Sequence, residues 1–410
     1  VYNENMSVLS ITRSVNIPDA VRINRYRRTP ELGPNILFFS GGSALTEISK
    51  ELKQYTYNST HLIPGSDSGG SSAKLRKAFA MPAIGDLRNR LMSLADESVM
   101  GQPDVYRLFN HRLPIDLPNN KLNKELESMI GGKHPLIATI SNPMRRLIRH
   151  QLGFFHRAMD KNFDLRGACI GNLILAGGYL NNHRQLDSII FLFSKLVDVR
   201  GVVQPVVNDN LHLAARLADD SYIIGQHRLT GKEVKPLSIP IKRLEFSSHS
   251  SKRVPVTTKI RKTTRKLISS AELICYPPGS FYSSLIANLL PGGVADAIAE
   301  NHCAKVFVPN LGQDPEQIGM SLDNTIVTLL KYLHAGASEG KNKSCENACE
   351  NKHFLNFVLY DSRRGQYASA LSLGLMEELG VSIIDTRLIS RKSAPYYDPE
   401  LLVAALLSLT

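Results

Sequence analysis

Short apolar segments alternate with helix-like segments along most of this sequence, and loops rich in glycine, serine or proline follow several of the apolar segments. The segment 36–39 precedes the glycine pair in 40–43, and 272–276 precedes the loop PPGS at 277–280. Such alternation is typical of a parallel β-sheet with helices on both faces. We therefore expect an α/β fold with a doubly wound, mostly parallel sheet. Further strands of this sheet are expected at 59–63, 305–308, 355–360 and 381–385.

Two insertions interrupt this alternation. Amphipathic segments predict a helical insertion at about 97–160. From about 199 to 250 the sequence alternates as antiparallel strands do, with polar turns between them. We assign residues 34–410 to a single domain, expect a polar N-terminal arm or short strand within 1–33, and interpret 336–353 as a flexible insertion. The antiparallel strands are expected at 199–207, 211–217 and 221–225.

The composition fits a protein with a large core, because 43% of the 410 residues are hydrophobic. Five cysteines without a regular framework favour a reducing compartment. We find neither an apolar run of membrane length nor a signal-type leader, so we expect a cytoplasmic protein that does not enter the membrane.

The formal net charge is +12, which favours an anionic ligand over a cationic one. The densest basic run, 251–266, contains seven lysines and arginines. Aromatic side chains, on which nucleic-acid bases stack, do not occur among them. Nucleic acid is therefore not expected as a partner.

Two glycine-serine loops follow the first two expected strands. Gly41 and Gly42 stand between a strand and a helix, where free N–H groups and the helix dipole suit a phosphate; a tight turn without a ligand explains the pair equally well. The second loop, 65–72, reads GSDSGGSS, and its successive amides are suited to an anion-binding nest, while its last serines also suit a helix cap. Asp67 within it either caps a turn or holds a divalent cation against a diphosphate.

Later segments place polar residues at similar corners. Asp86 follows a Pro–Gly turn and either caps the next helix or faces a ligand. Asn172 follows a glycine inside an apolar helix-like segment, where glycine costs about 1 kcal/mol and needs close packing or a ligand to justify it. The loops 277–280 and 310–316 each follow an expected strand. Because ligands of such sheets bind beyond the carboxyl ends of the strands, we expect these loops on one rim.

Six segments occur here in the order found in the CofD/YvcK family. They are GGSALTEISKELK, SDSGGSSAKLR, MPAIGDLRNRLMSLADES, FDLRGACIGNL, PPGSFYSSLIANLLPGGVADAI and VFVPN. The sequence resembles this family over roughly 35–322, and most resembles a bacterial CofD-like branch. The family joins 2-phospho-L-lactate transferases to YvcK-type gluconeogenesis and morphogenesis factors. The resemblance implies a Rossmann-like fold with the ligand at the carboxyl rim.

CofD enzymes transfer a phospholactyl or phosphoenolpyruvyl-type group from a guanosine diphospho donor to a deazaflavin alcohol, with magnesium. YvcK-type members bind nucleotide sugars. The resemblance thus implies either a transferase that uses a nucleoside diphosphate donor and Mg²⁺, or a non-catalytic nucleotide-sugar-binding regulator of central carbon or cell-wall metabolism. For a transferase, the implied catalytic residues are Asp67, Asp86 and Arg88, with Asp67 as the metal ligand. The implied nucleotide-binding residues are Gly41, Gly42, Ser43, Gly69, Gly70, Ser71, Ser72, Asn89, Asn172, Gly279, Ser280, Tyr282 and Asn310.

The sequence departs from the family pattern at two places. YvcK-type relatives carry two adjacent aspartates before the double glycine, whereas the second position here is Ser68, so a magnesium site would rest on Asp67 alone. The segment 310–316 is one residue shorter than its family counterpart.

Two further hypotheses concern metals and assembly. Cys345, Cys349 and His353 have a spacing compatible with zinc, but a fourth ligand is missing. The apolar helices expected at 144–160 and 281–290 would suit the interface of a homo-oligomer.

Overall fold

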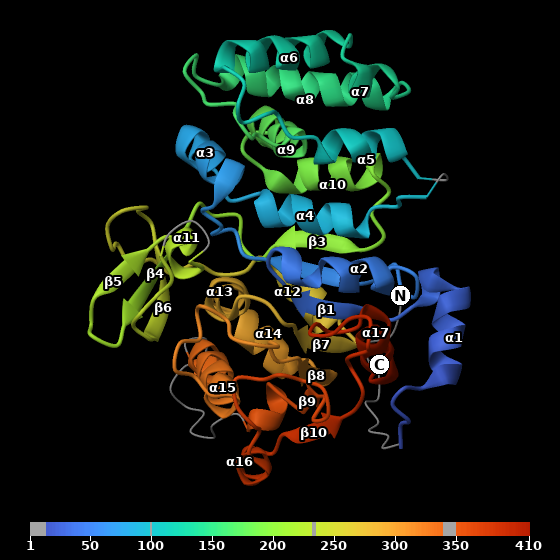
Figure 1. Ribbon diagram of the computed structural model, residues 1–410, viewed down its shortest axis with the longest axis vertical. Coiled ribbons are helices and arrows are strands. Elements are labelled where there is room, and N and C mark those ends of the chain that lie inside the picture. The colour runs from blue at the N-terminus through green and yellow to red at the C-terminus, as the bar shows by residue number, and fades with distance from the viewer. Residues whose placement is uncertain (1–13, 99–100, 232–234, 339–349) are drawn as a thin grey trace, which may run out of the picture.

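A computed structural model describes residues 14–98, 101–231, 235–338 and 350–410. Its centre is a parallel sheet of seven strands in the order β10-β9-β8-β7-β1-β2-β3 (Figure 1). This sheet confirms the α/β fold expected from the alternation of strands and helices. The strands are β1 (Ile36–Phe39), β2 (Thr60–Ile63), β3 (Val202–Pro205), β7 (Leu273–Tyr276), β8 (Ala304–Phe307), β9 (Phe357–Tyr360) and β10 (Ser382–Asp385).

The central strand β1 is apolar throughout because helices cover both faces of the sheet. Leu37 and Phe39 share a core with α12 (Lys262–Ser269), α14 (Val294–Glu300) and α15 (Leu322–Ser338). Ile36 and Phe38 point to the opposite face, as alternate residues of a strand must. There they pack with α2 (Thr46–Leu52) and α17 (Pro399–Ser408).

A layer of helices with its own core extends beyond the β2–β3 end of the sheet (Figure 1). The helices expected between 97 and 160 are found within it. Ile63 of β2 and Val203 of β3 pack into this core, which joins the layer to the sheet. The layer comprises α3 (Gly70–Phe79), α4 (Gly85–Leu94), α5 (Pro103–Asn110), α6 (Asn119–Gly131), α7 (Pro135–Ala138), α8 (Met144–Ala158), α9 (Ile170–Asn181) and α10 (Leu186–Leu196).

A small antiparallel sheet, ordered β5-β4-β6, stands beside the rim of the main sheet (Figure 1). Its strands are β4 (His212–Leu217), β5 (Tyr222–Ile224) and β6 (Ile241–Ser247), and the short α11 (Gln226–Leu229) follows β5. The prediction of an antiparallel strand at 199–207 was wrong, because β3 pairs in parallel with β2. As an edge strand β3 alternates between exposed and buried residues, and this alternation imitates an antiparallel strand.

The beginning and end of the described chain pack together. Instead of a strand, residues before 34 contain helix α1 (Ala20–Arg28), and the backbone N–H of Asp19 donates to Ser408 Oγ of α17 at 2.8 Å. Residues 1–13 and 339–349, and with them Cys345 and Cys349 of the zinc hypothesis, lie outside the described residues. α16 (Leu373–Leu379) precedes β10. In the described ranges, no helix is both long and apolar enough to cross a membrane.

Candidate functional site

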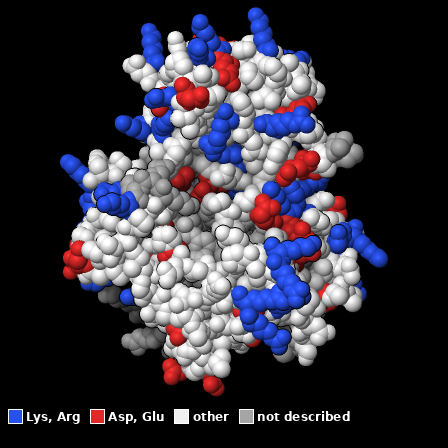
Figure 2. Space-filling view, in the orientation of Figure 1, with Lys and Arg blue, Asp and Glu red and all other residues white. Residues whose placement is uncertain are grey.

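A cavity of about 160 Å³ opens at the carboxyl ends of β1, β2 and β7. The chain leaves β1 toward β2 on one side and returns at β7 on the other, so this is the point where the strand order reverses, the usual ligand position in such sheets. Figure 2 shows a hollow in this region with acidic side chains at its edge. The lining residues are Gly41 to Leu45, Asp67, Gly69, Asp86, Gln226, His227, Thr230, Pro278 to Ser280 and Ser284.

The loop after β1 is held from behind by a buried arginine of α4. Arg90, 1% exposed, donates to the carbonyl oxygens of Gly41 and Gly42 at 3.1 Å each. It also donates to Leu45 O at 2.8 Å and Ser49 Oγ at 2.6 Å. Burial lowers the Arg90 pKa to about 10, so the guanidinium stays charged at neutral pH.

These bonds decide which way the loop's amides face. In a trans peptide the N–H points opposite to the preceding carbonyl, so the N–H groups of Gly42 and Ser43 point away from Arg90. Among the described residues, the N–H groups of Gly42 and Ser43 donate no hydrogen bond. A side chain at position 41 is excluded, because its Cβ would lie 2.1 Å from Ser284 Oγ. The loop therefore offers bare amides to a ligand.

The loop after β2 is held by a second buried arginine, and two of its amides donate hydrogen bonds within the protein. Arg76 of α3, with a pKa that burial lowers to about 10, donates to Ser66 O at 3.0 Å and Asp67 O at 2.8 Å. The N–H of Gly69 donates to Asp67 Oδ1 at 3.0 Å, and that of Ser68 donates to Gln226 Oε1 at 3.2 Å. Two amides of the expected anion nest are thus satisfied within the protein, and the loop also presents the Asp67 carboxylate.

The antiparallel sheet contributes α11 to the cavity wall. Ser68 Oγ lies 2.8 Å from His227 Nδ1, and the backbone N–H of His227 donates to Ser68 Oγ at 3.0 Å. Ser68 occupies the position at which YvcK-type relatives carry the second aspartate. In this chain the position joins the second loop to α11.

The loop after β7 is positioned by Asn310, which follows β8. Gly279, whose φ of +146° favours glycine, donates its N–H to Asn310 Oδ1 and accepts from Asn310 Nδ2, both at 2.7 Å. Ser280 follows and lines the cavity. Asn310 therefore acts on the cavity indirectly, by fixing Gly279.

Two carboxylates cap the helical segment that begins at Phe281 and leads through a π-helical turn into α13 (Ala287–Leu289). Asp314 Oδ2 accepts from the N–H of Phe281 at 2.8 Å. Glu316 Oε2 accepts from the N–H groups of Tyr282 and Ser283, also at 2.8 Å each. Burial, with the charge of Asp314 adding to it, raises the Glu316 pKa to about 7. This helix N-terminus is thus closed to an external phosphate.

The charge of the lining is negative. Asp67 and Asp86 are both present, and within the described residues no lysine or arginine lines the cavity. The two carboxylates flank the start of α4: Asp67 Oδ2 would be 2.8 Å from a Cβ at Gly85, the neighbour of Asp86. The described residues contain no group of three or more potential metal ligands. This donor set fits Mg²⁺, which typically takes one or two carboxylates and completes its shell with water and substrate phosphates.

Several residues named from the sequence lie behind the cavity lining. Arg88 points into the helical layer and donates to Asn110 Oδ1 at 3.0 Å, so we do not assign it a catalytic role. Asn172 of α9 donates to Ser71 Oγ at 2.9 Å and so supports the second loop. Tyr282 Oη donates to Ile241 O of β6 at 3.3 Å. Gly70, Ser71, Ser72 and Asn89 also lie outside the lining set, whereas Gly41, Gly42, Ser43, Asp67, Gly69, Asp86, Gly279 and Ser280 belong to it.

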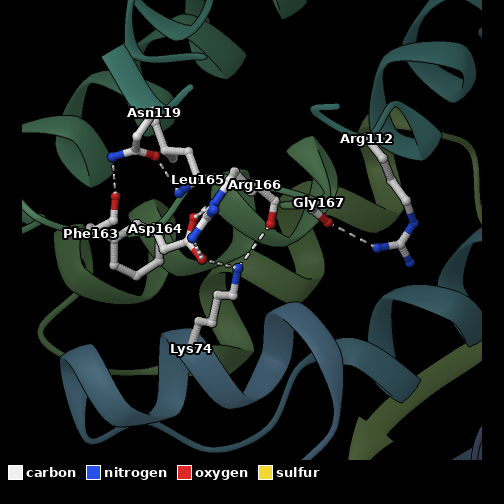
Figure 3. Close-up of polar contacts among 8 residues, drawn as sticks. All are labelled: Lys74, Arg112, Asn119, Phe163, Asp164, Leu165, Arg166 and Gly167. Carbon is white, nitrogen blue, oxygen red and sulfur yellow. Dashed lines mark hydrogen bonds and ion pairs between the residues drawn. The ribbon is translucent and has the colours of Figure 1, made fainter. Parts of the chain in front are cut away.

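Lys74, on the helix that follows the second loop, turns away to the helical layer (Figure 3). Its ammonium lies 2.7 Å from Asp164 Oδ2 and 2.9 Å from Arg166 O. Hydrogen bonds from Arg166 and then Lys74 hold the Asp164 pKa well below its usual range. Asn119 fixes the same loop by donating to Phe163 O at 2.8 Å. Lys74 therefore belongs to a structural contact.

Sequence reasoning missed Arg90 and the α11 residues Gln226 and His227. Arg90 lies four residues after Asp86 and so on the same side of α4. That spacing could have indicated that Arg90 lies near the cavity. Because both faces of α4 are buried, the pattern did not separate Arg90 from Arg88, and Arg88 was assigned to the site instead. α11 carries no motif that distinguishes it from a polar turn.

A family model described as 2-phospho-L-lactate transferase CofD matches residues 36–389. The chain belongs to the CofD family. This membership confirms the resemblance drawn from the six segments, and it extends beyond the region in which they lie.

Curated relatives of this CofD-family chain include proteins named gluconeogenesis factor. One from Halalkalibacterium halodurans is 25% identical over 305 residues, which are 74% of each chain. One from Bacillus subtilis is 26% identical over 301 residues, 73% of this chain and 74% of that one. A Nostoc relative is 27% identical over 307 residues, 75% of this chain but 53% of that one. The chain thus spans about half the length of the Nostoc protein.

The fold is shared with a solved structure. A Bacillus halodurans protein of the UPF0052 family superposes with a TM-score of 0.65 at 21% identity, and the match covers 92% of this chain and 99% of that one. At this identity the likeness supports the fold of the CofD-family chain and not its ligand.

Proposed function

We propose that the cavity binds the diphosphate of a nucleoside diphosphate ligand together with Mg²⁺, and that the protein transfers a phosphorylated organic group from this ligand to an acceptor hydroxyl. One observation carries the proposal: the lining combines bare amides with two carboxylates and, in the described part of the chain, no lysine or arginine. A diphosphate alone would be repelled by Asp67 and Asp86. A divalent cation between them and the phosphates removes that repulsion.

The roles of the residues follow from their positions. The N–H groups of Gly42 and Ser43 bind phosphate oxygens, as bare amides between a strand and a helix do. Asp67 and Asp86 hold the cation. The cavity, at about 160 Å³, is smaller than the roughly 300–1,000 Å³ typical of sites that enclose a whole ligand. We therefore place only the phosphates inside and the nucleoside at the open edge.

The reaction would be a displacement at phosphorus. The acceptor oxygen bonds to the phosphorus that carries the organic group, the bond to the bridging oxygen breaks, and a nucleoside monophosphate leaves. The acceptor proton passes to a carboxylate or to water. Mg²⁺ would offset the charge that develops on the phosphate oxygens. With Arg88 turned away, we assign the phosphate contacts to the loop amides.

The alternative is a regulator that binds a nucleotide sugar without turnover. Two observations favour it: curated relatives carry the name gluconeogenesis factor, and no described arginine reaches the cavity to stabilise a transition state. The two functions share the binding site and differ in turnover and in the need for a metal.

The test is calorimetric titration with GDP, UDP and a UDP-sugar, with and without Mg²⁺. We expect Mg²⁺ to strengthen binding of one diphosphate by at least about tenfold, because it neutralises the carboxylates. Asp67→Asn and Asp86→Asn should each remove that gain. Asp104→Asn, which alters a surface ion pair with Arg107, is the matched control and should keep it.

Release of nucleoside monophosphate in the presence of an acceptor then separates the two functions. A UDP-sugar that binds equally well without metal and is recovered intact would favour the regulator. Failure of all three ligands to bind would reject the nucleotide site itself.

A further inference from the structure

A second concave region lies at the carboxyl ends of β9 and β10. Two adjoining hollows of about 300 and 480 Å³ share Arg364 and Arg387, and we call them together the C-terminal cleft. Figure 2 shows basic side chains gathered over α17 and the neighbouring C-terminal strands. The basic residues that line the cleft are Arg363, Arg364, Arg387, Arg391 and Lys392.

In the described part of the chain, these five cations have no ion-pair partner. Of the ion pairs in the described residues, none involves any of the five. Arg364 donates to Ile389 O at 3.2 Å, and the side chains of the other four make no hydrogen bond to described residues. In contrast, Arg253, Arg261 and Arg265 of the densest basic run all form ion pairs with acidic residues. The cleft therefore gathers basic side chains that form no ion pair with described residues.

The carboxylates of the cleft are occupied by the protein. Asp361, 2% exposed, accepts from the N–H groups of Leu388 and Ile389 at 2.9 and 3.0 Å. Asp385 accepts from the backbone N–H of Ser362 at 3.0 Å and from its hydroxyl. Asp398 caps α17. The lining carries five positive and three negative charges, a surplus of two positive charges, and the negative ones are already hydrogen-bonded.

We propose that the C-terminal cleft binds a small molecule that carries two or more phosphate groups. Four arginines present planar forks that match phosphate oxygens in pairs, and Lys392 adds a point charge. The volumes lie in the range of small-molecule sites. A concave site between two loops suits a compact ligand better than a nucleic-acid strand, which needs a groove or an aromatic platform.

The cleft is separate from the cavity at β1. The cavity is lined by the loop after β7 and the cleft by the loop after β9, and β8 lies between these two strands, so the nearest lining loops are about 10 Å apart along the sheet. The cavity offers amides and carboxylates, so its ligand needs a cation. The cleft offers cations, so its ligand does not.

The test is calorimetric titration with inorganic triphosphate in the presence of EDTA, which removes divalent cations and so excludes the metal-dependent site. The cleft variant is Arg363→Gln, Arg387→Gln and Arg391→Gln combined. These three side chains are exposed and form no hydrogen bond or ion pair with described residues, so the variant is expected to fold. The matched control replaces the exposed Arg25, Arg27 and Arg28 of α1 by Gln, with the same change in charge.

We expect triphosphate to bind the wild-type protein and the α1 variant alike, and its affinity to fall at least about tenfold in the cleft variant. EDTA keeps this result independent of the proposed nucleotide site, which needs a divalent cation. Equal weakening in the cleft and α1 variants would mean attraction to net charge alone and would overturn the proposal. A single-stranded oligonucleotide that binds more tightly than triphosphate and is lost in the same variant would overturn it too, by assigning the cleft to nucleic acid.

Discussion

The cavity at β1 and the C-terminal cleft lie along the same edge of one sheet, yet they arrange charge in opposite ways. At the cavity the arginines are buried behind the loops and bind carbonyl oxygens, while the carboxylates face the ligand. At the cleft the carboxylates are bound to backbone N–H groups, and the arginines face solvent. The difference teaches that a net charge of +12 says little about where an anion binds. A lysine or arginine can attract an anion only where its side chain faces the ligand, and the sequence does not show which ones do.

The comparison is tested most strongly by making the same substitution in both regions. Arg90→Lys removes a fork that reaches four acceptors and leaves carbonyl groups buried without partners. We expect a loss of about 3–5 kcal/mol of unfolding free energy, together with loss of nucleotide binding. Arg387→Lys keeps an exposed charge without partners and should change stability by less than about 0.5 kcal/mol. Urea denaturation measures both, and equal losses would show that burial is not what separates the two sets of arginines.

An effect of intermediate size is expected from Glu316, which caps the helical segment beside the cavity and makes the free energy of unfolding depend on pH. Since the Glu316 pKa is raised from 4.5 to about 7, the folded protein binds this proton more tightly than the unfolded chain does. Stability from this group is therefore full below about pH 4.5 and falls as the pH rises to about 7, by about 1–3 kcal/mol.

Urea midpoints at pH 5 and pH 7.5, for wild type and Glu316→Gln, measure that effect. The variant should lack this part of the pH dependence. If its midpoint falls by as much as that of the wild type, Glu316 does not stay protonated near neutrality and caps this helix as a charged carboxylate.

The smallest effect is expected from Lys74→Ala, which removes an exposed lysine beside the second loop. Its ion pair with Asp164 is more than one-third exposed on both sides, and such pairs contribute about 0.5 kcal/mol or less. Because Lys74 faces the helical layer, nucleotide affinity should stay within about twofold of the wild type. Thermal unfolding and calorimetry check both values. A large loss of affinity would place Lys74 at the ligand. The cavity would then use a positive side chain as the cleft does, and the contrast between the two regions would fail.

Much of the fold could be predicted because strand and helix differ in period and length. β1, β2 and β7 to β10 were expected close to their observed bounds, since buried parallel strands are short apolar runs. β3 was mispredicted because an edge strand exposes one side and so alternates. Local pattern does not reveal which neighbour a strand will pair with.

The site was predictable where glycine and aspartate mark loops, and less so where side-chain direction matters. Gly41, Asp67, Asp86 and Gly279 do meet at one cavity. Arg88 and Arg90 could not be told apart, because α4 is buried on both sides and helical periodicity then selects no face. The cleft escaped notice for another reason: Arg363 and Arg387 lie on two loops far apart in the sequence, which the pairing of β9 with β10 brings together.

The arginines behind the cavity loops also determine whether ligand binding or the folded sheet is lost first when the protein unfolds. Arg76 and Arg90 belong to α3 and α4, so the shape of both loops is fixed when these helices dock, and a ligand meets them preorganised, with little further conformational entropy to lose. The same anchoring makes recognition dependent on two helices outside the sheet. If those helices open locally, both loops are released together. The protein then loses its affinity for the ligand while its sheet is still folded.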